Sequence, residues 1–360
     1  MTTRATRNCA STVVVLLALL VAGCSEGPSG AGGSGNAASS GDSDAPKGGK
    51  VVRVALPTAQ MSFANADIAV ADAKGYFREQ GVGVKLQNFG SGLKVVQAVV
   101  SGGADIGASS IEPVASANAR GQSLPIIGAY TDRLAVTMVT PKKITDPAQL
   151  RGKRLGIQDV GAFREVMTRL VLKGVNLTPD DVSYRPVESN GYTGALLAGQ
   201  IQSGILQQEQ AIDAMEKDDG FHVLKDLYAI DPDYFYGTYF AKPAWLKANT
   251  GSAERFLAAI TKAHRFMYEN KEETVKIVTK ATGFAPKVID EAYARLLDRN
   301  AVFPVNDGLD ENRLTHTLGR MKELGLLQGA TPKVSEIVDR TPIEGAIERI
   351  GGPAPDPRDE

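Results

Sequence analysis

The chain has 360 residues, of which 43% are hydrophobic and 22% are charged, a composition typical of a globular protein with a sizeable core. Its 40 Lys and Arg residues balance 41 Asp and Glu residues, so the net charge of −1 gives no basic surface for nucleic acid, and we expect no nucleic-acid partner. The two cysteines, Cys9 and Cys24, lie within the first 24 residues. The rest of the chain therefore has no disulfide framework and no thiolate metal site.

The first 23 residues have the pattern of a secretion signal. Arg4 and Arg7 precede an unbroken apolar run from Val13 to Ala22, which is too short to span a bilayer. The run ends in the sequence LVAGC, which resembles a bacterial lipobox whose cysteine becomes the acylated first residue. We predict a signal peptide over residues 1–23 and lipidation of Cys24. The alternative is an ordinary signal peptide followed by a chance cysteine.

Residues 24–50 are predicted to form a flexible tether after the lipidated cysteine. From Ser25 to Lys50, 20 of 26 residues are Gly, Ser, Ala or Pro, and none carries a large apolar side chain. Such a chain spans about 25–30 Å root-mean-square. We therefore expect a protein anchored by lipid to the cell membrane and facing outside the cytoplasm. The remaining 310 residues are enough for two lobes.

The hydrophobic pattern of the body predicts strands that alternate with helices. The predicted strands are 51–57, 82–89, 104–108, 124–130, 134–140, 154–158, 183–187, 201–206, 221–227 and 236–241. The predicted helices are 68–75, 93–100, 111–120, 163–173, 192–198 and 209–217, and residues 243–327 are mainly helical. Repeated strand–helix–strand units favour mostly parallel sheets covered on both faces, with binding at the carboxyl ends of the strands.

The order of these elements predicts a discontinuous domain. No strand-rich second half follows residue 241, so the simplest arrangement returns the chain to the first lobe. We expect lobe 1 to comprise residues 51–137 and 238–350, lobe 2 to comprise 138–237, and residues 351–360 to be a flexible tail. Two crossings make a hinge, and two hinged lobes enclose a cleft. The fold class is α/β, two-lobed, with an interlobe cleft.

Three sequence landmarks carry a resemblance to a known family. They are the segment AKGYF at 73–77, GGADIG at 102–107 and LRGKRLG at 150–156. In order and spacing, over about residues 51–330, the chain resembles the bacterial substrate-binding proteins for nitrate, sulfonate, taurine and thiamine-pyrimidine precursors. The resemblance implies a type II periplasmic-binding-protein fold. It also implies delivery of a small solute to an ABC permease and its ATPase, and we expect the protein to be a monomer.

The resemblance further implies where the ligand lies, between the lobes and against the loop after the first strand and several helix N-termini. The residues that these positions predict as ligand-binding are Gln60, Ser62, Phe63, Ser109, Ser110, Gly161, Phe163, Arg164, Gln207, Glu209 and Tyr236. Helix N-termini and Arg164 favour an anionic group. The alternatives are that the two serines only cap a helix, that Arg164 pairs with a surface acid, and that Phe163 belongs to the core.

The class of ligand is predicted less sharply. Many relatives carry an aromatic residue with a nearby acid where this chain reads LQQEQ at 206–210, so their specificity does not transfer. We favour a small organic anion, sulfonate- or carboxylate-like, for which Tyr130, Tyr234, Tyr236 and Tyr239 offer stacking faces if it is aromatic. The tyrosines equally suit packing at the hinge. A pyrimidine or another amine-bearing heterocycle is the second choice, because Glu112, Glu209 and the glutamines suit it.

Enzyme chemistry is not expected. The segment SGLK at 91–94 matches the S-x-x-K motif of penicillin-recognising enzymes, but S-D-N and K-T-G are absent, and Ser91 is better explained as a helix cap. Related folds include pyrimidine-synthesising proteins that consume their own histidine, yet the inferred cleft loops hold none. His222, His264 and His316 lack metal-ligand spacing, so we predict no metal and no cofactor. A ligand sensor, rather than a transporter subunit, is the remaining alternative.

Overall fold

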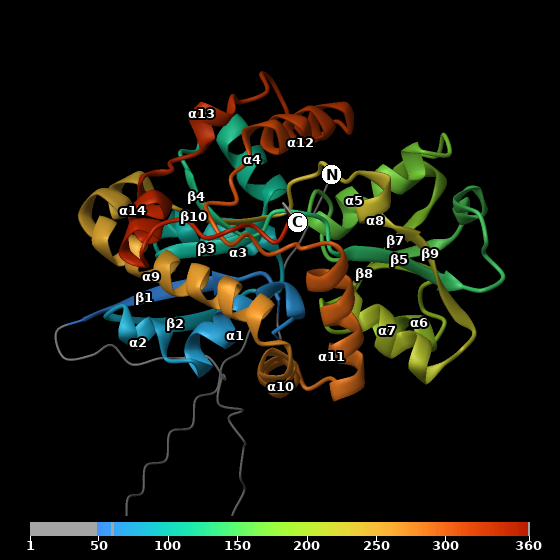
Figure 1. Ribbon diagram of the computed structural model, residues 1–360. Coiled ribbons are helices and arrows are strands. Elements are labelled where there is room, and N and C mark those ends of the chain that lie inside the picture. Colours follow the sequence, from blue (N-terminus) through green and yellow to red (C-terminus); the bar gives the residue numbers. More distant parts are fainter. Residues whose placement is uncertain (1–48, 59–60, 359–360) are drawn as a thin grey trace, which may run out of the picture. The chain divides into compact units, whose positions relative to one another are not determined.

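The computed structural model describes residues 49–58 and 61–358 (Figure 1). By its contacts the chain divides into Met1–Ala38 and one compact unit, Ser39–Glu360, and everything below concerns the described part of the second. The predicted signal peptide, Cys24 and Gln60 lie outside the described residues, as does nearly all of the predicted tether. Within the described residues, no helix has the length and apolar character needed to cross a membrane.

Two five-stranded sheets form the centre of the molecule (Figure 1). The first sheet has the order β2-β1-β3-β10-β4, and the second has the order β7-β6-β8-β5-β9. The strands of the first sheet are β1 (Lys50–Leu56), β2 (Val82–Asn88), β3 (Ile106–Ser110), β4 (Ile126–Thr131) and β10 (Gly237–Ala241). Those of the second are β5 (Val136–Pro141), β6 (Arg154–Ile157), β7 (Ser183–Pro186), β8 (Ser203–Gln207) and β9 (Phe221–Asp226).

Each sheet is mixed rather than purely parallel. In the first, β1 pairs in parallel with β2 and β3, whereas β10 pairs antiparallel with β3 and β4. In the second, β6 pairs in parallel with β7 and β8, whereas β5 pairs antiparallel with β8 and β9. Both antiparallel strands are the first that the chain forms after leaving the other sheet. Four strands of each sheet thus share one direction, as the repeated strand–helix–strand units predict, and the exception marks a crossing.

The helices cover both sheets and continue to the C-terminus. Those before β5 are α1 (Ala66–Ala73), α2 (Tyr76–Glu79), α3 (Gly92–Ser101) and α4 (Ile111–Ala119), with a 3₁₀ turn at Phe63–Asn65. Those between β5 and β10 are α5 (Phe163–Lys173), α6 (Tyr192–Leu197), α7 (Gln208–Lys217) and α8 (Leu227–Ile230), with 3₁₀ turns at Pro147–Leu150 and Pro179–Asp181. The last group is α9 (Pro243–Glu269), α10 (Lys271–Thr282), α11 (Pro286–Tyr293), α12 (Glu311–Glu323), α13 (Val334–Ile337) and α14 (Thr341–Arg349), with a π-helical segment at Ala294–Arg299.

Turn chemistry explains several of these boundaries. Gly102 ends α3 with φ +80°, a left-handed conformation that favours glycine. Pro243 and Pro286 stand at the first position of α9 and α11, where a missing N–H costs nothing. Ser91 is the N-cap residue of α3 but its side chain makes no capping bond, so its predicted position holds and its predicted capping bond does not.

A series of aromatic rings runs through the core of the first sheet to the second. Phe77 stacks on Phe256 at 5.8 Å, and Phe256 meets Tyr239 edge-on at 5.2 Å. Tyr239 then contacts Tyr130 at 5.8 Å, Tyr130 contacts Tyr236 at 5.7 Å, and Tyr236 stacks on Phe163 of α5 at 4.2 Å. The last contact joins the first-sheet side to the second-sheet side. Such pairs add about 0.5–1.5 kcal/mol each beyond the area that they bury.

The C-terminal residues hold both crossings between the sheets. In the second crossing, the Asp231 carboxylate receives His316 Nε2 at 2.6 Å and Arg320 Nε at 2.9 Å, both from α12. The Phe235 amide donates to Thr317 Oγ1 at 2.7 Å. In the first crossing, Arg358 bonds the Asp132 carboxylate. The crossings are therefore fixed by the part of the chain that follows them.

Candidate functional site

Two neighbouring cavities lie where the strand ends of the two sheets face each other. A small one, of about 30 Å³, is lined by Pro57, Thr58, Gly92, Ser110, Tyr130, Gln158, Phe163, Arg164, Gln207 and Tyr236. A larger one, of about 350 Å³, shares Thr58 and Arg164 with it and extends over α6, α7 and the turn after α10. The predicted site residues that line at least one of them are Ser62, Ser110, Phe163, Arg164, Gln207, Glu209 and Tyr236.

Arg164 stands at the second position of α5 and is 3% exposed. Its guanidinium donates to the Ile205 carbonyl, to Gln210 Oε1 at 2.9 Å and to the Ser189 carbonyl at 3.5 Å. It also lies 4.1 Å above the ring of Tyr192. A guanidinium carries five N–H donors, and these three acceptors leave two for a ligand. All three acceptors are neutral oxygens, so among the described residues no carboxylate is hydrogen-bonded to this buried charge.

Glu209 links the two sides of the site. It lies in the first turn of α7, and its Oε1 accepts the Phe63 amide, from the loop after β1, at 3.2 Å. Its Oε2 is buried without a hydrogen-bond partner. Burial raises the pKa of this carboxyl, and its two backbone hydrogen bonds and the charge of Arg164 only partly offset that. Glu209 is therefore a buried acid with one oxygen left for a ligand.

Tyr236 and Gln207 make the next contact between the sides. Gln207 Nε2 donates to the Tyr236 hydroxyl at 3.0 Å, and burial raises the pKa of Tyr236 to about 12. Gln158 Nε2 donates to the Gly90 carbonyl at 2.8 Å and adds a second link. With the stacked Phe163 ring, these bonds hold the edges of the two sheets together over a cavity that has room for about one water.

The other predicted residues lie around the cavities without lining them. Phe63 is fully buried against Phe303, and only its amide faces Glu209. Ser109 is buried beneath Gly92, where a Cβ on that glycine would come within 2.4 Å of its hydroxyl. Gly161 has φ +79° and donates its N–H to Glu165 Oε2 at 3.0 Å. Among the tyrosines, Tyr234 and Tyr239 bond the buried acids Glu112 and Asp67, each at 2.7 Å.

Sequence reasoning missed a third wall of the larger cavity. Residues 282–285, which comprise the last residue of α10 and the turn before α11, line it together with Asn190 and Thr193. Asn190 and Thr193 follow β7, so a search for polar residues after every strand would have found them as weak candidates. The turn at 282–285 gives no such signal, because only tertiary packing brings a turn between two C-terminal helices to this place.

None of the three histidines lines either cavity. His264 lies in the core, with Nδ1 at 2.7 Å from the Pro304 carbonyl and Nε2 at 3.3 Å from Asp67 Oδ2. His222 Nε2 contacts the Ile144 carbonyl at 2.8 Å, and His316 holds Asp231. Within residues 49–58 and 61–358, no group of three potential ligands is placed to hold a metal ion.

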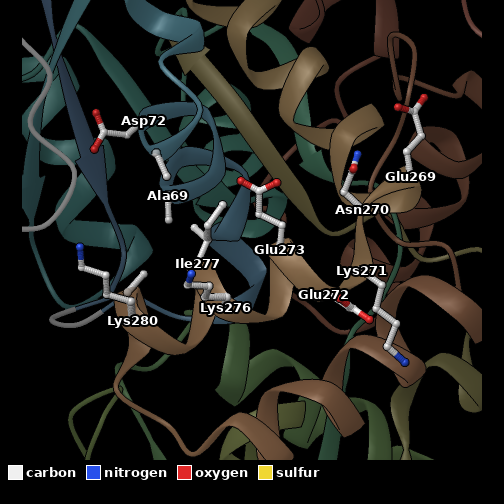
Figure 2. A pocket seen from close by; sticks show the side chains of 12 residues that line it. Ala69, Asp72, Glu269, Asn270, Lys271, Glu272, Glu273, Lys276, Ile277 and Lys280 are labelled. Atoms are coloured by element: carbon white, nitrogen blue, oxygen red, sulfur yellow. The ribbon is translucent and has the colours of Figure 1, made fainter.

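A hollow larger than either of these cavities lies elsewhere, against α1, α10 and the end of α9 (Figure 2). It measures about 910 Å³, and Ala69 and Ile277 lie among its lining residues. The charged residues around it are Asp72, Glu269, Lys271, Glu272, Glu273, Lys276 and Lys280. Both charge signs are present, and none of the predicted site residues is there. Size alone therefore does not identify the functional site.

The buried acid predicts a pH effect. Folding raises the pKa of Glu209, so the folded protein binds the Glu209 proton more tightly than the unfolded chain does. The Glu209 carboxyl therefore favours folding at pH values below its unfolded pKa. That contribution to stability is lost as the pH rises through the folded pKa. Replacing Glu209 with glutamine should remove that loss. Melting temperatures of Glu209→Gln and the unmodified protein, measured from pH 4 upward, should diverge in favour of the variant.

Glu323 provides a control of opposite sign. Hydrogen bonds from Arg320 and Lys173 lower its pKa, so its contribution is lost as the pH falls. Glu323→Gln should therefore lose stability relative to the unmodified protein at higher pH and match it at low pH. If the melting temperatures of Glu209→Gln and of the unmodified protein varied with pH in the same way, the raised pKa of Glu209 would be contradicted.

The geometry defines the class of fold. Two mixed α/β sheets, joined by two crossings and facing each other across a polar site at their strand ends, make up the periplasmic-binding-protein fold. The alkanesulfonate-binding protein SsuA of Xanthomonas axonopodis pv. citri, solved with bound MOPS, superposes with a TM-score of 0.66 at 17% identity. The superposition covers 81% of this chain and 98% of that one.

The sequence then gives the family. The model of the family described as NMT1/THI5 like matches residues 62–274, more than half of the chain, and the chain belongs to that family. The putative binding protein YtlA of Bacillus subtilis (strain 168) is 24% identical over 306 residues, which cover 83% of this chain and 87% of YtlA. The 4-amino-5-hydroxymethyl-2-methylpyrimidine phosphate synthase of Aspergillus parasiticus is 29% identical over 213 residues, which cover 55% of this chain and 61% of the synthase.

Proposed function

We propose that the protein is the solute-binding subunit of an ABC importer and that it captures a small organic anion, sulfonate- or carboxylate-like, between two lobes. It acts as a monomer, anchored outside the cytoplasm through Cys24, and passes the solute to a permease with its ATPase. One observation carries the choice of an anion. Arg164 brings a buried positive charge to both cavities, and the acceptors that it contacts in the structure are neutral oxygens.

Closure of the lobes is the proposed mechanism. The bond from the Phe63 amide to Glu209, the bond from Gln158 to Gly90 and the Phe163–Tyr236 stack each join the two sides. Contacts of this kind exist only when the sides are together, and a ligand that touches both sides adds to them. Binding therefore shifts the population toward the closed arrangement, whose outline the permease recognises. No covalent step is required.

The fold of SsuA and the name of YtlA support a binding role, because both are described as binding proteins. The pyrimidine phosphate synthases of the same family support a second candidate, a pyrimidine with donor nitrogens. Glu209 favours that candidate, since its free, buried Oε2 would accept an amine N–H. The hypothesis that the protein is a synthase that consumes its own histidine has less support, because in the described part of the chain no histidine lines either cavity.

A thermal-shift panel on the purified full-length chain tests this proposal. The panel contains alkyl and aryl sulfonates, aromatic carboxylates, nitrate, taurine and pyrimidines. A ligand at 100 times its dissociation constant adds about 2.7 kcal/mol to the free energy of unfolding, enough to raise the melting temperature by several degrees. We expect a selective shift with sulfonates or carboxylates. A shift with pyrimidines alone would replace the anion with the second candidate, and no shift with any class would contradict solute capture.

Transport and sensing are separated by a second measurement. The loaded protein is added to its permease and ATPase in lipid vesicles, and ATP hydrolysis is followed. Stimulation supports the importer subunit. A protein that binds the solute without stimulating ATP hydrolysis is a sensor.

A further inference from the structure

Apolar and basic side chains gather at the end of the first sheet that lies away from the cavities. The parallel strands of that sheet begin at this end, and the antiparallel β10 finishes here, since Ala241 pairs with Ile106 at the start of β3. Figure 1 shows that β1 begins on the side of its sheet away from the second sheet. We call this surface the amino-end patch. Its residues are Lys50, Val51, Val100, Lys242, Trp245 and Lys247.

Hydrogen bonds show that the residues of the amino-end patch are neighbours. Lys242 Nζ donates to the Val100 carbonyl at 3.3 Å, which joins the residue before α9 to the end of α3. Lys50 Nζ donates to Asn249 Oδ1 at 2.8 Å, and Asn249 Nδ2 donates to the Trp245 carbonyl at 3.0 Å. These bonds join the start of β1 to the same part of α9. The first turns of α9 therefore form the middle of the patch.

The apolar side chains of the patch are open to solvent. Val51 is 52% exposed and Val100 is 38% exposed, and they are two of the four large hydrophobic residues that are exposed among those the structure describes. Trp245, the one tryptophan of the sequence, is half-buried beside them. A single exposed valine is ordinary on a protein surface. Two valines together with a tryptophan and lysines have the composition of a surface that binds at the boundary between water and lipid.

The patch is positively charged. Lys50 and Lys242 each donate to a neutral oxygen, and Lys247 is exposed. In the part of the chain that the structure describes, none of these three lysines is paired with a carboxylate. Asp105, which precedes β3, and Glu254, on α9, each form an ion pair with an arginine, so neither neutralises the lysines. The charge of the patch therefore complements an anionic surface.

The predicted lipid anchor would hold the patch next to a membrane. The predicted tether ends at Lys50, which is the first residue of β1 and belongs to the patch. Because the tether spans about 25–30 Å root-mean-square, the patch meets the membrane at a high effective concentration, and a weak attraction is enough to dock it. Each lysine near an anionic lipid surface strengthens binding about fivefold. Three lysines and a tryptophan supply such an attraction.

We propose that the amino-end patch docks the protein on the anionic lipid headgroups of the membrane that holds its anchor. This interaction goes beyond solute capture and uses only the anchor at Cys24 from the proposed function. The cavities lie at the opposite ends of the strands, beside Pro57 and Ser110. In the docked arrangement they face away from the bilayer, so the solute site stays open to the surroundings.

The single tryptophan reports on docking directly. The full-length chain with Cys9→Ser is coupled through the Cys24 thiol to a maleimide lipid in vesicles, so the test does not depend on acylation in a cell. The vesicles contain phosphatidylcholine alone or mixed equally with phosphatidylglycerol, and a nitroxide on some of the headgroups quenches nearby tryptophan. We expect stronger quenching of Trp245 in the vesicles with phosphatidylglycerol. The difference should vanish in about 1 M salt, where charges are screened within about 3 Å.

Two matched pairs of substitutions complete the design. Lys242→Gln with Lys247→Gln should lower the ratio of docked to free protein about 30-fold, because two of the three lysines are lost. Lys276→Gln with Lys280→Gln removes the same charge from the exposed side of α10, outside the patch, and should leave the quenching unchanged. Equal quenching with and without phosphatidylglycerol, or the same loss for both lysine pairs, would overturn lipid docking and leave the patch to a protein partner.

The two proposals fail separately. Because no solute is present in the quenching experiment, a silent thermal-shift panel with patch-dependent quenching rejects solute capture and leaves lipid docking standing. A selective thermal shift with equal quenching in both kinds of vesicle rejects lipid docking and leaves solute capture standing. The anchor is measured directly, by mass spectrometry of the protein from cell membranes. A Cys24 without acyl chains would overturn docking in the cell.

Discussion

Replacing Arg164 with methionine is expected to weaken an anionic ligand about 10- to 100-fold and to lower the free energy of unfolding by about 2–4 kcal/mol. Both effects have one cause. The guanidinium satisfies the Ile205 and Ser189 carbonyls and the Gln210 amide while facing the cavities, so methionine leaves buried acceptors unpaired and removes the positive charge. Calorimetric titration with the ligand class that the panel selects measures the loss of affinity, and denaturant unfolding measures the loss of stability.

Lysine at the same position separates charge from geometry. Arg164→Lys keeps the charge but not the planar fork, so it should recover part of the affinity and little of the stability. An affinity that Arg164→Met leaves unchanged would remove Arg164 from the ligand site. The residue would then be a structural link among α5, α7 and β8.

Replacing Phe256 with alanine is expected to cost about 3–5 kcal/mol of the free energy of unfolding. Phe256 is fully buried on α9, between the rings of Phe77 and Tyr239, near one end of the aromatic series. Alanine would leave a cavity that these rigid neighbours cannot fill. Urea unfolding of the full-length chain gives the value.

Phe266, on the same helix, provides the control. It is only partly buried and contacts Tyr76 at 6.3 Å, so Phe266→Ala should cost clearly less. Equal losses for the two variants would show that the aromatic series does not concentrate stability around Phe256.

The fold was predictable because its signals are local. Apolar alternation and helical spacing indicated nearly every strand and helix through β10, and α5 spans the same residues that the sequence predicts. The resemblance over residues 51–330 led to the same fold as the solved structures and the family match. The direction of β5 and β10 was not predictable in this way, because pairing direction depends on which strand the chain meets after it crosses.

The site was predictable to the level of strand ends and helix starts. From these positions Ser110, Phe163, Arg164, Gln207 and Glu209 were predicted as site residues, and each lines one of the cavities. It did not reveal that Arg164 is tied to protein acceptors, nor that Ser109 turns away under Gly92, because side-chain direction depends on neighbours from other elements. The contribution of residues 282–285 to the larger cavity was not predicted for the same reason.

The position of β10 has a consequence for the order of folding. This strand lies between β3 and β4, yet more than a hundred residues separate it from either of them along the chain. The first sheet therefore stays split until residue 241 is available, whereas the second sheet draws all of its strands from the continuous stretch between β5 and β9. Local contacts form before distant ones, so the second sheet has what it needs to assemble first. A chain made from its N-terminus thus carries an unfinished sheet until its middle has folded, and the last strand to arrive closes it.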